Sequence, residues 1–143
     1  MQRGREYVIA IAVRLHPDTE LAELLEPVQR EDGSWIEPGF MFNGLSAPQI
    51  TWTPSGYYPF HPKVVHAACI HDDDYTRKQG LRRVADERFK RNLLAGGVEP
   101  EAANVMFIVV RECGNEFWPG DKEDIAERDR RVQAERRRVE EAP

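Results

Sequence analysis

The chain has 143 residues, of which 41% are hydrophobic and 31% are charged, and its formal net charge is −5. That length is enough for one domain with a buried core. We expect no transmembrane segment, since no apolar run approaches the roughly 20 residues of a membrane span, and no nucleic-acid partner, since the net charge is negative. The apolar stretch near the N-terminus is too short for a signal peptide.

The first third of the chain predicts short elements joined by turns. Residues 7–13 form a β-branched apolar run, typical of a strand buried on both faces, and Pro17 ends it. Residues 18–25 have the pattern of a short capped helix. Residues 28–36 predict a β-hairpin with its turn at 31–33.

A loop and an aromatic-rich segment follow. The Gly and Pro residues of 38–48 predict a shaped loop or a bulged strand, in which Phe40 and Phe42 alternate and are expected to enter the core. Residues 49–60 hold a concentration of aromatic side chains: Trp52, Tyr57, Tyr58 and Phe60. Such a segment is typical of a lid over a site or of a partner-binding patch, and anchoring to the core is the third interpretation.

Three helices are predicted next, over residues 61–79, 81–95 and 100–113, with glycines at their ends. The third is the most apolar, and we expect it to be the buried spine of the domain. The fold class is therefore α+β, with a small antiparallel N-terminal sheet packed on a three-helix core. Residues 1–120 are predicted to form a single globular domain.

The remaining segment, residues 121–143, predicts a protruding charged helix. It carries eight acidic and seven basic residues, and its large aliphatic residues, Ile125, Val132 and Val139, recur every seven positions. The polar residues Arg128 and Glu135 argue against a self-standing coiled coil. The helix is either solvated or docked on a partner, and we expect docking within a homo- or hetero-oligomer.

Two cysteines, Cys69 and Cys113, fall on predicted apolar helix faces, and neither belongs to a CxxC pair. We expect both to be buried, reduced thiols. A disulfide between the two helices is the alternative that the sequence leaves open.

Helical spacing brings three polar residues together. His71 shares a stripe with Val64, Ala68 and Tyr75, which are seven before it, three before it and four after it. Asp86 shares a face of the next helix with Phe89 and Leu93. A buried carboxylate is costly unless it is paired, so we predict that His71 and Asp86 are partners where the two helices meet.

The neighbouring charged residues are expected to face water. Arg82, Arg83, Glu87 and the later basic residues of the second helix cover its remaining sides. Asp72, Asp73 and Asp74 in a row are typical of a solvated, acidic helix end.

The His71–Asp86–Tyr75 cluster has three interpretations: an inert lock between two helices, a catalytic group, or a non-catalytic metal or ligand site. Other chemistries lack their patterns, since Ser46 is not in a GxSxG elbow and neither a Walker loop, a dinucleotide fingerprint nor zinc-ligand spacing is present.

The order GSW…PGFMFNGLSAP…HAACIHDDDY…ADERFKRNL…VRECG resembles a family of tailed bacteriophages and prophages that is classified as a domain of unknown function. In that family a GF-x-TDGAS-x-P loop precedes an HD-x-x-Y helix and an AD-x-x-F helix. The resemblance covers residues 32–118, and Asn43 stands where the family usually has Asp.

This resemblance implies a phage or prophage virion or morphogenesis protein with a structural or accessory role. Its partners would be other virion or phage proteins. It would be made in the bacterial host cytoplasm and assembled into the particle.

The helix pair is also similar to the catalytic core of phospholipase A2, in which an HD-x-x-Y helix packs against a helix bearing an Asp. That resemblance implies His71 as a general base acting through water, Asp86 and Tyr75 as the groups that orient it, and Asp72 as a Ca²⁺ ligand. Asn43 is a second candidate metal ligand. The alternative function is therefore a small Ca²⁺-dependent hydrolase of lipid or other esters during entry or lysis, with membrane-surface contact. The glycine-rich calcium loop and the disulfide framework of that family have no counterpart here.

Overall fold

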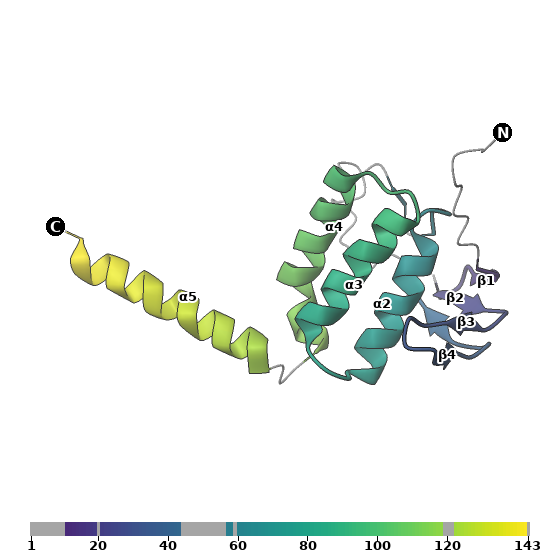
Figure 1. Cartoon of the computed structure of the whole chain (residues 1–143), viewed down its shortest axis with the longest axis horizontal. Coiled ribbons are helices and arrows are strands. Elements are labelled where there is room, and N and C mark those ends of the chain that lie inside the picture. Colours follow the sequence, from purple (N-terminus) through teal and green to yellow (C-terminus); the bar gives the residue numbers. More distant parts are fainter. Residues whose placement is uncertain (1–10, 20, 44–56, 59, 119–121, 143) are drawn as a thin grey trace.

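The computed structural model describes residues 11–19, 21–43, 57–58, 60–118 and 122–142, with the backbone alone for residues 116 and 122–128. Within these residues, short strands precede three packed helices, and a further helix projects from them toward the C-terminus (Figure 1). The sheet lies on one side of the helical layer. The predicted α+β fold is confirmed.

The main sheet is antiparallel and has the strand order β1-β2-β5. It consists of β1 (Val13–His16), β2 (Leu21–Leu24) and β5 (Met41–Phe42). In β2, Ala22 and Leu24 are buried while Leu21 and Glu23 are half-buried, which is the two-residue period of a strand. The helix predicted over residues 18–25 is therefore wrong. Pairing with strands on both sides, which is not local in sequence, decides the conformation.

Strand β1 lies at the edge of this sheet. It ends at His16, directly before Pro17, as predicted. The strand begins at Val13, where the predicted strand over residues 7–13 ends, and residues 11–13 are half-buried, so the expectation of burial on both faces is wrong for the described part. Residues 7–10 of that prediction lie outside the described residues.

The hairpin predicted over residues 28–36 is confirmed. Strands β3 (Val28–Gln29) and β4 (Trp35–Ile36) pair antiparallel, with Val28 opposite Ile36. Gly33 has φ 87°, a left-handed conformation that glycine adopts without strain, and this allows the turn.

The predicted core role of the aromatic residues is confirmed in part. Phe42 is buried, and Phe40 is half-buried and stacks on it with ring centroids 6.0 Å apart. Tyr57 is buried among the helices, while Tyr58 is exposed. Residues 44–56 and 59, including Trp52, lie outside the described residues.

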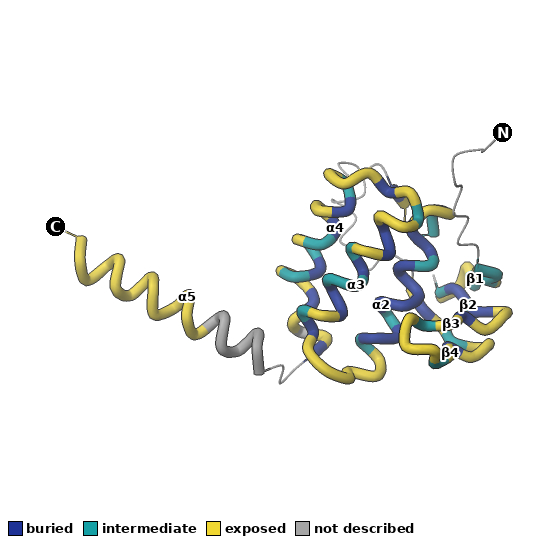
Figure 2. Tube along the Cα trace, in the orientation of Figure 1, coloured by how far each residue is buried: buried dark blue, intermediate teal, exposed yellow. Residues whose placement is uncertain are grey.

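Helix α2 is the centre of the fold. The three helices are α2 (Val65–Arg77), α3 (Arg82–Ala95) and α4 (Pro100–Cys113), close to their predicted bounds. Two hydrophobic clusters meet on α2, and Figure 2 shows it buried along much of its length. Its Ala67 and Ala68 face α3 and α4, while Cys69 and Ile70 face the sheet. Burial of apolar surface on both sides stabilises the two layers together.

The prediction that the third helix is the buried spine is wrong. On α4 the buried residues are Ala103, Met106 and Val110, whereas the Ile108 side chain is 50% exposed. Helix α4 is the outermost of the three and packs on α3, so one face stays open (Figure 1).

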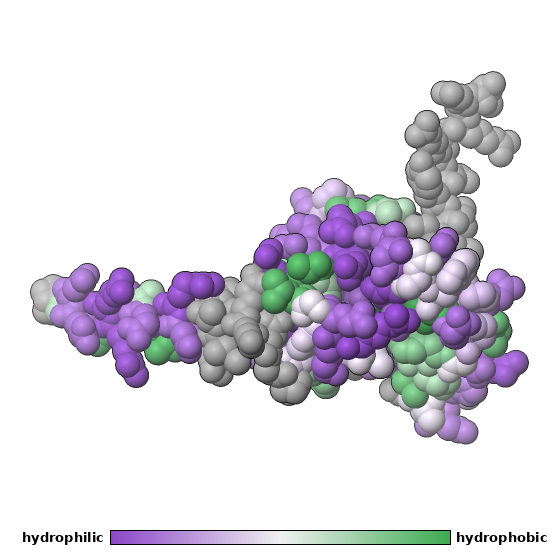
Figure 3. Space-filling model, turned by 60° about the horizontal axis from the view of Figure 1, so that its bottom comes forward, coloured by the Kyte–Doolittle hydropathy of each residue, from purple (hydrophilic) through white to green (hydrophobic). Residues whose placement is uncertain are grey.

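The C-terminal part continues with η2 (Gly114–Phe117), a short 3-10 helix, and with α5 (Lys122–Glu141), which confirms the predicted charged helix. Helix α5 extends away from the other helices, and its visible surface is largely hydrophilic (Figures 1 and 3). Val132 and Val139 are exposed on it. None of the helices in the described ranges combines the length and the apolar character that a membrane crossing requires.

Candidate functional site

Asp86 is the centre of a buried polar network between the helices. Its side chain is 0% exposed. Its Oδ1 accepts hydrogen bonds at 2.7 Å from His71 Nε2 and at 2.7 Å from the Tyr75 hydroxyl. Its Oδ2 lies 3.2 Å from Arg82 Nη1 and 2.9 Å from Arg111 Nη1. The predicted His71–Asp86 pairing and the place of Tyr75 beside it are confirmed as geometry.

The imidazole of His71 is held in one orientation. Its ring lies between those of Tyr75 and Phe89, with both centroid distances 4.5 Å. Because an ionised Asp86 can only accept, Nε2 carries the proton and Nδ1 has a free lone pair. Within the described part of the chain, Nδ1 has no hydrogen-bond partner, and the His71 side chain lies on the wall of a cavity.

Arg82 ties this network to the end of α4. Its Nη1 donates to the carbonyl of Val110 at 2.9 Å, and its Nη2 donates to that of Arg111 at 2.9 Å. Arg82 is 2% exposed, so the expectation that it covers an outer side of its helix is wrong. The C-terminal turn of α4 comes close enough to accept hydrogen bonds from Arg82. The sequence pattern of α3 alone does not predict this contact. The spacing of Arg82 four residues before Asp86 was the available signal.

Charge stabilises the ionised form of Asp86. Burial by itself raises the pKa of Asp86, but hydrogen bonds from His71, Tyr75 and Arg111 outweigh it and hold the pKa below its ordinary value. Burial and the nearby Asp86 carboxylate raise the pKa of Tyr75. Tyr75 therefore stays a neutral donor to Asp86.

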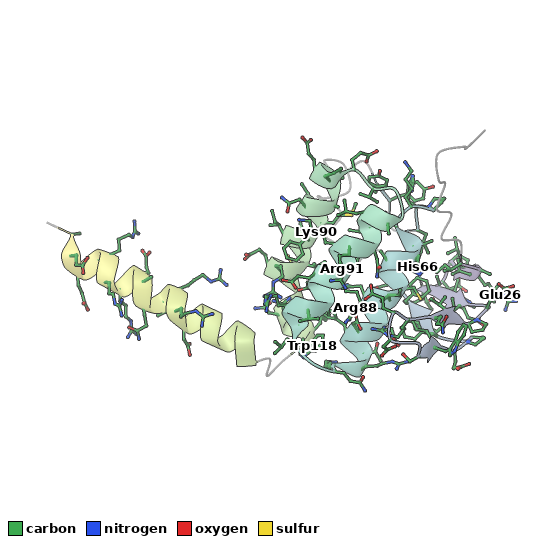
Figure 4. The ribbon with its side chains drawn as sticks, in the orientation of Figure 1. Glu26, His66, Arg88, Lys90, Arg91 and Trp118 are labelled. Atoms are coloured by element: carbon green, nitrogen blue, oxygen red, sulfur yellow. The ribbon has the colours of Figure 1, made fainter. Side chains whose placement is uncertain are left out.

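Gly114 and Trp118, which follow α4 in the chain, pack against the outer side of the network. A Cβ atom on Gly114 would lie 2.6 Å from the Tyr75 hydroxyl and 2.8 Å from Arg82 Nη1, so a larger residue would have to displace one of these two groups. Trp118 is buried and packs edge-on against the ring of Tyr75 at 5.2 Å (labelled in Figure 4). From the sequence, Gly114 was expected only to end the third helix, and its contact with the network is a finding of the structure.

A cavity of about 520 Å³ opens beside His71. Its walls come from β2, β5, α2, the end of α4 and η2. They are formed by Leu21, Met41, Phe42, Asn43, His71, Asp72, Tyr75, Thr76, Lys78, Val110, Cys113, Gly114 and Phe117. The two predicted metal ligands meet on this wall, where Asp72 Oδ2 accepts a hydrogen bond from the Asn43 backbone N–H at 3.0 Å. All five predicted site residues therefore belong to one region.

The donors near Asp72 fit a calcium ion poorly. Ca²⁺ takes about six to eight oxygen ligands, usually with several carboxylates. No three His, Cys, Asp or Glu side chains within the described ranges lie close enough to hold a metal ion. Asp72 and Asn43 would supply one carboxylate and one amide, and Gly44 lies outside the described residues. The described donors do not make a calcium site by themselves.

The two aspartates after Asp72 have a structural role instead. Asp73 and Asp74 are buried. Arg30, from the turn that follows β3, donates to Asp73 Oδ2 at 2.7 Å and to Asp74 Oδ1. Arg88 reaches across from α3 and donates to Asp74 Oδ2 at 2.8 Å (Figure 4). The prediction of a solvated acidic helix end is wrong for these two, because arginines from the hairpin and α3 neutralise them.

The cysteines differ from each other. Cys69 is fully buried against the sheet, and burial raises the pKa of the Cys69 thiol to about 12. Cys113 is exposed, so the prediction that both are buried is wrong for it. Both thiols are free, so the disulfide that the sequence left open is not formed.

Comparison with known families gives one result. Residues 22–110 match the family described as Protein of unknown function (DUF1353). The chain belongs to this family. The match confirms the resemblance to a domain-of-unknown-function family, and it spans β2 to α4 and hence His71, Asp86 and Tyr75. No curated protein and no solved structure matches the chain.

Proposed function

We propose that this DUF1353 chain carries a hydrolytic site in which His71 is the general base. The observation that supports it is that the two imidazole nitrogens have different surroundings. Nε2 is bound to a buried carboxylate, while Nδ1 is unpartnered among the described residues, on the wall of a cavity. A helix lock would need the first of these contacts, but the open nitrogen and the cavity add nothing to it.

The proton transfers follow from this arrangement. A water hydrogen-bonded to Nδ1 attacks a carbonyl carbon held in the cavity, and its proton passes to Nδ1. Asp86 then faces an imidazolium through Nε2, and its negative charge stabilises that ion. The proton returns from Nδ1 to the leaving alcohol oxygen. Tyr75 and Phe89 keep the ring in place throughout.

The walls of the cavity favour an ester with an apolar part. Leu21, Met41, Phe42, Val110 and Phe117 supply most of its hydrophobic lining. Such walls bind apolar groups and exclude competing water.

The test is ester hydrolysis by the purified chain, with para-nitrophenyl esters and phospholipid vesicles as substrates. Each is assayed with calcium and with a chelator, which separates the calcium-dependent alternative. His71→Gln should lower kcat/KM by about a hundredfold or more. The matched control is His66→Gln on the same helix, away from the cavity lining. Hydrolysis that is absent in both conditions, or equal in the two variants, would count against the proposal.

A second proposal concerns where the protein acts. We infer a virion or morphogenesis protein of a phage or prophage, in which α5 docks on another subunit or phage protein. The loop and helix motifs support it, as does α5, whose described side chains from 129 to 142 are all exposed. Tagged protein expressed during phage growth should sediment with particles, and a variant ending at residue 120 should not. A full-length chain that stays monomeric and separate from particles would contradict it.

A further inference from the structure

The cavity beside His71 is also lined by a residue with a positively charged side chain. Lys78 lines the same cavity and follows His71 by seven residues. Lys78 is the residue that caps α2, so the backbone positions of the two residues lie about two helical turns, roughly 10 Å, apart along the helix axis. Asp72, next to His71, lies at the opposite end of this separation.

The ammonium group of Lys78 is available to a ligand. Over the described ranges it has neither an ion pair nor a hydrogen bond, whereas the arginines near the site bind carboxylates or backbone carbonyls. Lys78 is an exposed residue that lines the cavity. A cation without an internal partner keeps its full capacity for an incoming anion.

The backbone at Lys78 is also unusual. It is the one non-glycine residue with positive φ in the described parts of the chain, at 53°, and it caps α2 through a bond from its N–H to Asp74 O. Glycine or asparagine is the usual residue at such a position, since other side chains are strained there. A lysine in this conformation at the edge of a cavity is a candidate for a role of its side chain.

We propose that the cavity binds an amphiphilic anion, with its carboxylate or phosphate at Lys78 and its apolar chain along the hydrophobic wall. Asp72 repels an anion from the His71 end, so the charged group is directed toward Lys78. The anionic group would then lie at the C-terminal end of α2, and the bond that His71 addresses would lie nearer the middle of the helix. The position of the reacting bond rests on the proposed hydrolytic function. The binding of the anion at Lys78 does not depend on it.

The experiment measures binding by isothermal titration calorimetry with decanoate, decyl phosphate and decanol, which share one chain and differ in charge. Lys78→Gln should weaken the better of the two anions about tenfold and leave decanol unchanged. Lys78→Arg should retain the affinity. The control is Arg137→Gln, which removes one positive charge from the exposed part of α5.

The outcomes are separable from those of the hydrolysis test, because binding is read without turnover. Anion binding that depends on Lys78, in a chain that hydrolyses nothing, supports this inference and not the hydrolytic proposal. Equal affinity of Lys78→Gln and the parent chain for both anions would overturn it, as would an equal loss for decanol. The anion that loses more affinity identifies carboxylate or phosphate as the recognised group.

Discussion

The Tyr75 hydroxyl lies so close to Gly114 that a single added Cβ atom would come within 2.6 Å of it. Gly114 has φ −82° and ψ −14°, which any residue can adopt, so glycine is favoured here by the lack of space and not by the backbone conformation. The same Cβ atom would lie 2.8 Å from Arg82 Nη1. The end of α4 is thereby packed directly on the network around Asp86.

Gly114→Ala should therefore destabilise the chain by about 1–3 kcal/mol, as overpacked buried sites do. It should also displace Tyr75 or Arg82 and lower any activity of His71. Urea unfolding gives the first quantity, and hydrolysis gives the second. Backbone entropy alone predicts that alanine stabilises, so the sign of the change tests the close contact. Glu112→Ala, at an exposed position on the same helix, is the control.

Asp86→Ala should cost about 3–5 kcal/mol, because it leaves Arg82 as a buried cation without its carboxylate. His71→Gln should cost less, since Asp86 keeps its hydrogen bonds from Tyr75 and both arginines. Unfolding of both variants at pH 7 measures the difference. If Asp86→Ala costs no more than His71→Gln, Asp86 is not the centre of the network.

The helical residues of this site were predictable from sequence because helical periodicity is rigid. His71, Tyr75 and Asp86 each share a face with apolar residues of their own helix. Because apolar helix faces pack against each other, this places all three at the contact between α2 and α3. Arg82 and Gly114 were not predictable in this way. Their roles depend on how α4 ends against α2 and α3, which no single-helix pattern contains.

The strands show the same limit. The hairpin over residues 28–36 has a local turn signal, and it was predicted correctly. Strand β2 was predicted as a helix because its partners, β1 and β5, lie outside the window that a periodicity test reads. The burial of Asp73 and Asp74 is not predictable from local sequence either, because Arg30, which neutralises them, lies 43 and 44 residues away in the chain.

Arg30→Met should destabilise the chain by about 3 kcal/mol, because it leaves Asp73 and Asp74 buried with fewer partners. Hydrogen exchange should then increase first in β3 and β4, which Arg30 ties to α2. The matched control is Arg83→Met, which breaks an exposed i,i+4 pair with Glu87 and should cost less than about 1 kcal/mol. Similar costs for the two variants would mean that burial adds nothing to the Arg30 pairs.

His66 should make stability depend on pH between about 7 and 5. Burial lowers the pKa of His66, and its Nδ1 is buried without a hydrogen-bond partner (His66 is labelled in Figure 4). In the unfolded chain the ordinary pKa is about 6.5, so the unfolded state binds the proton first as the pH falls. The free energy of unfolding therefore decreases below that pH, and the decrease continues down to the folded-state pKa.

His66→Gln removes this contribution, so its stability should fall less than that of the parent chain between pH 7 and pH 5. Urea unfolding at the two pH values measures the two losses. Asn92→Leu is the control, because Asn92 also has a buried, unpartnered nitrogen but does not titrate. Its stability should be offset from that of the parent chain by the same amount at both pH values. An identical pH dependence in the His66→Gln variant and the parent chain would show that His66 accepts its proton equally well in the folded and unfolded states.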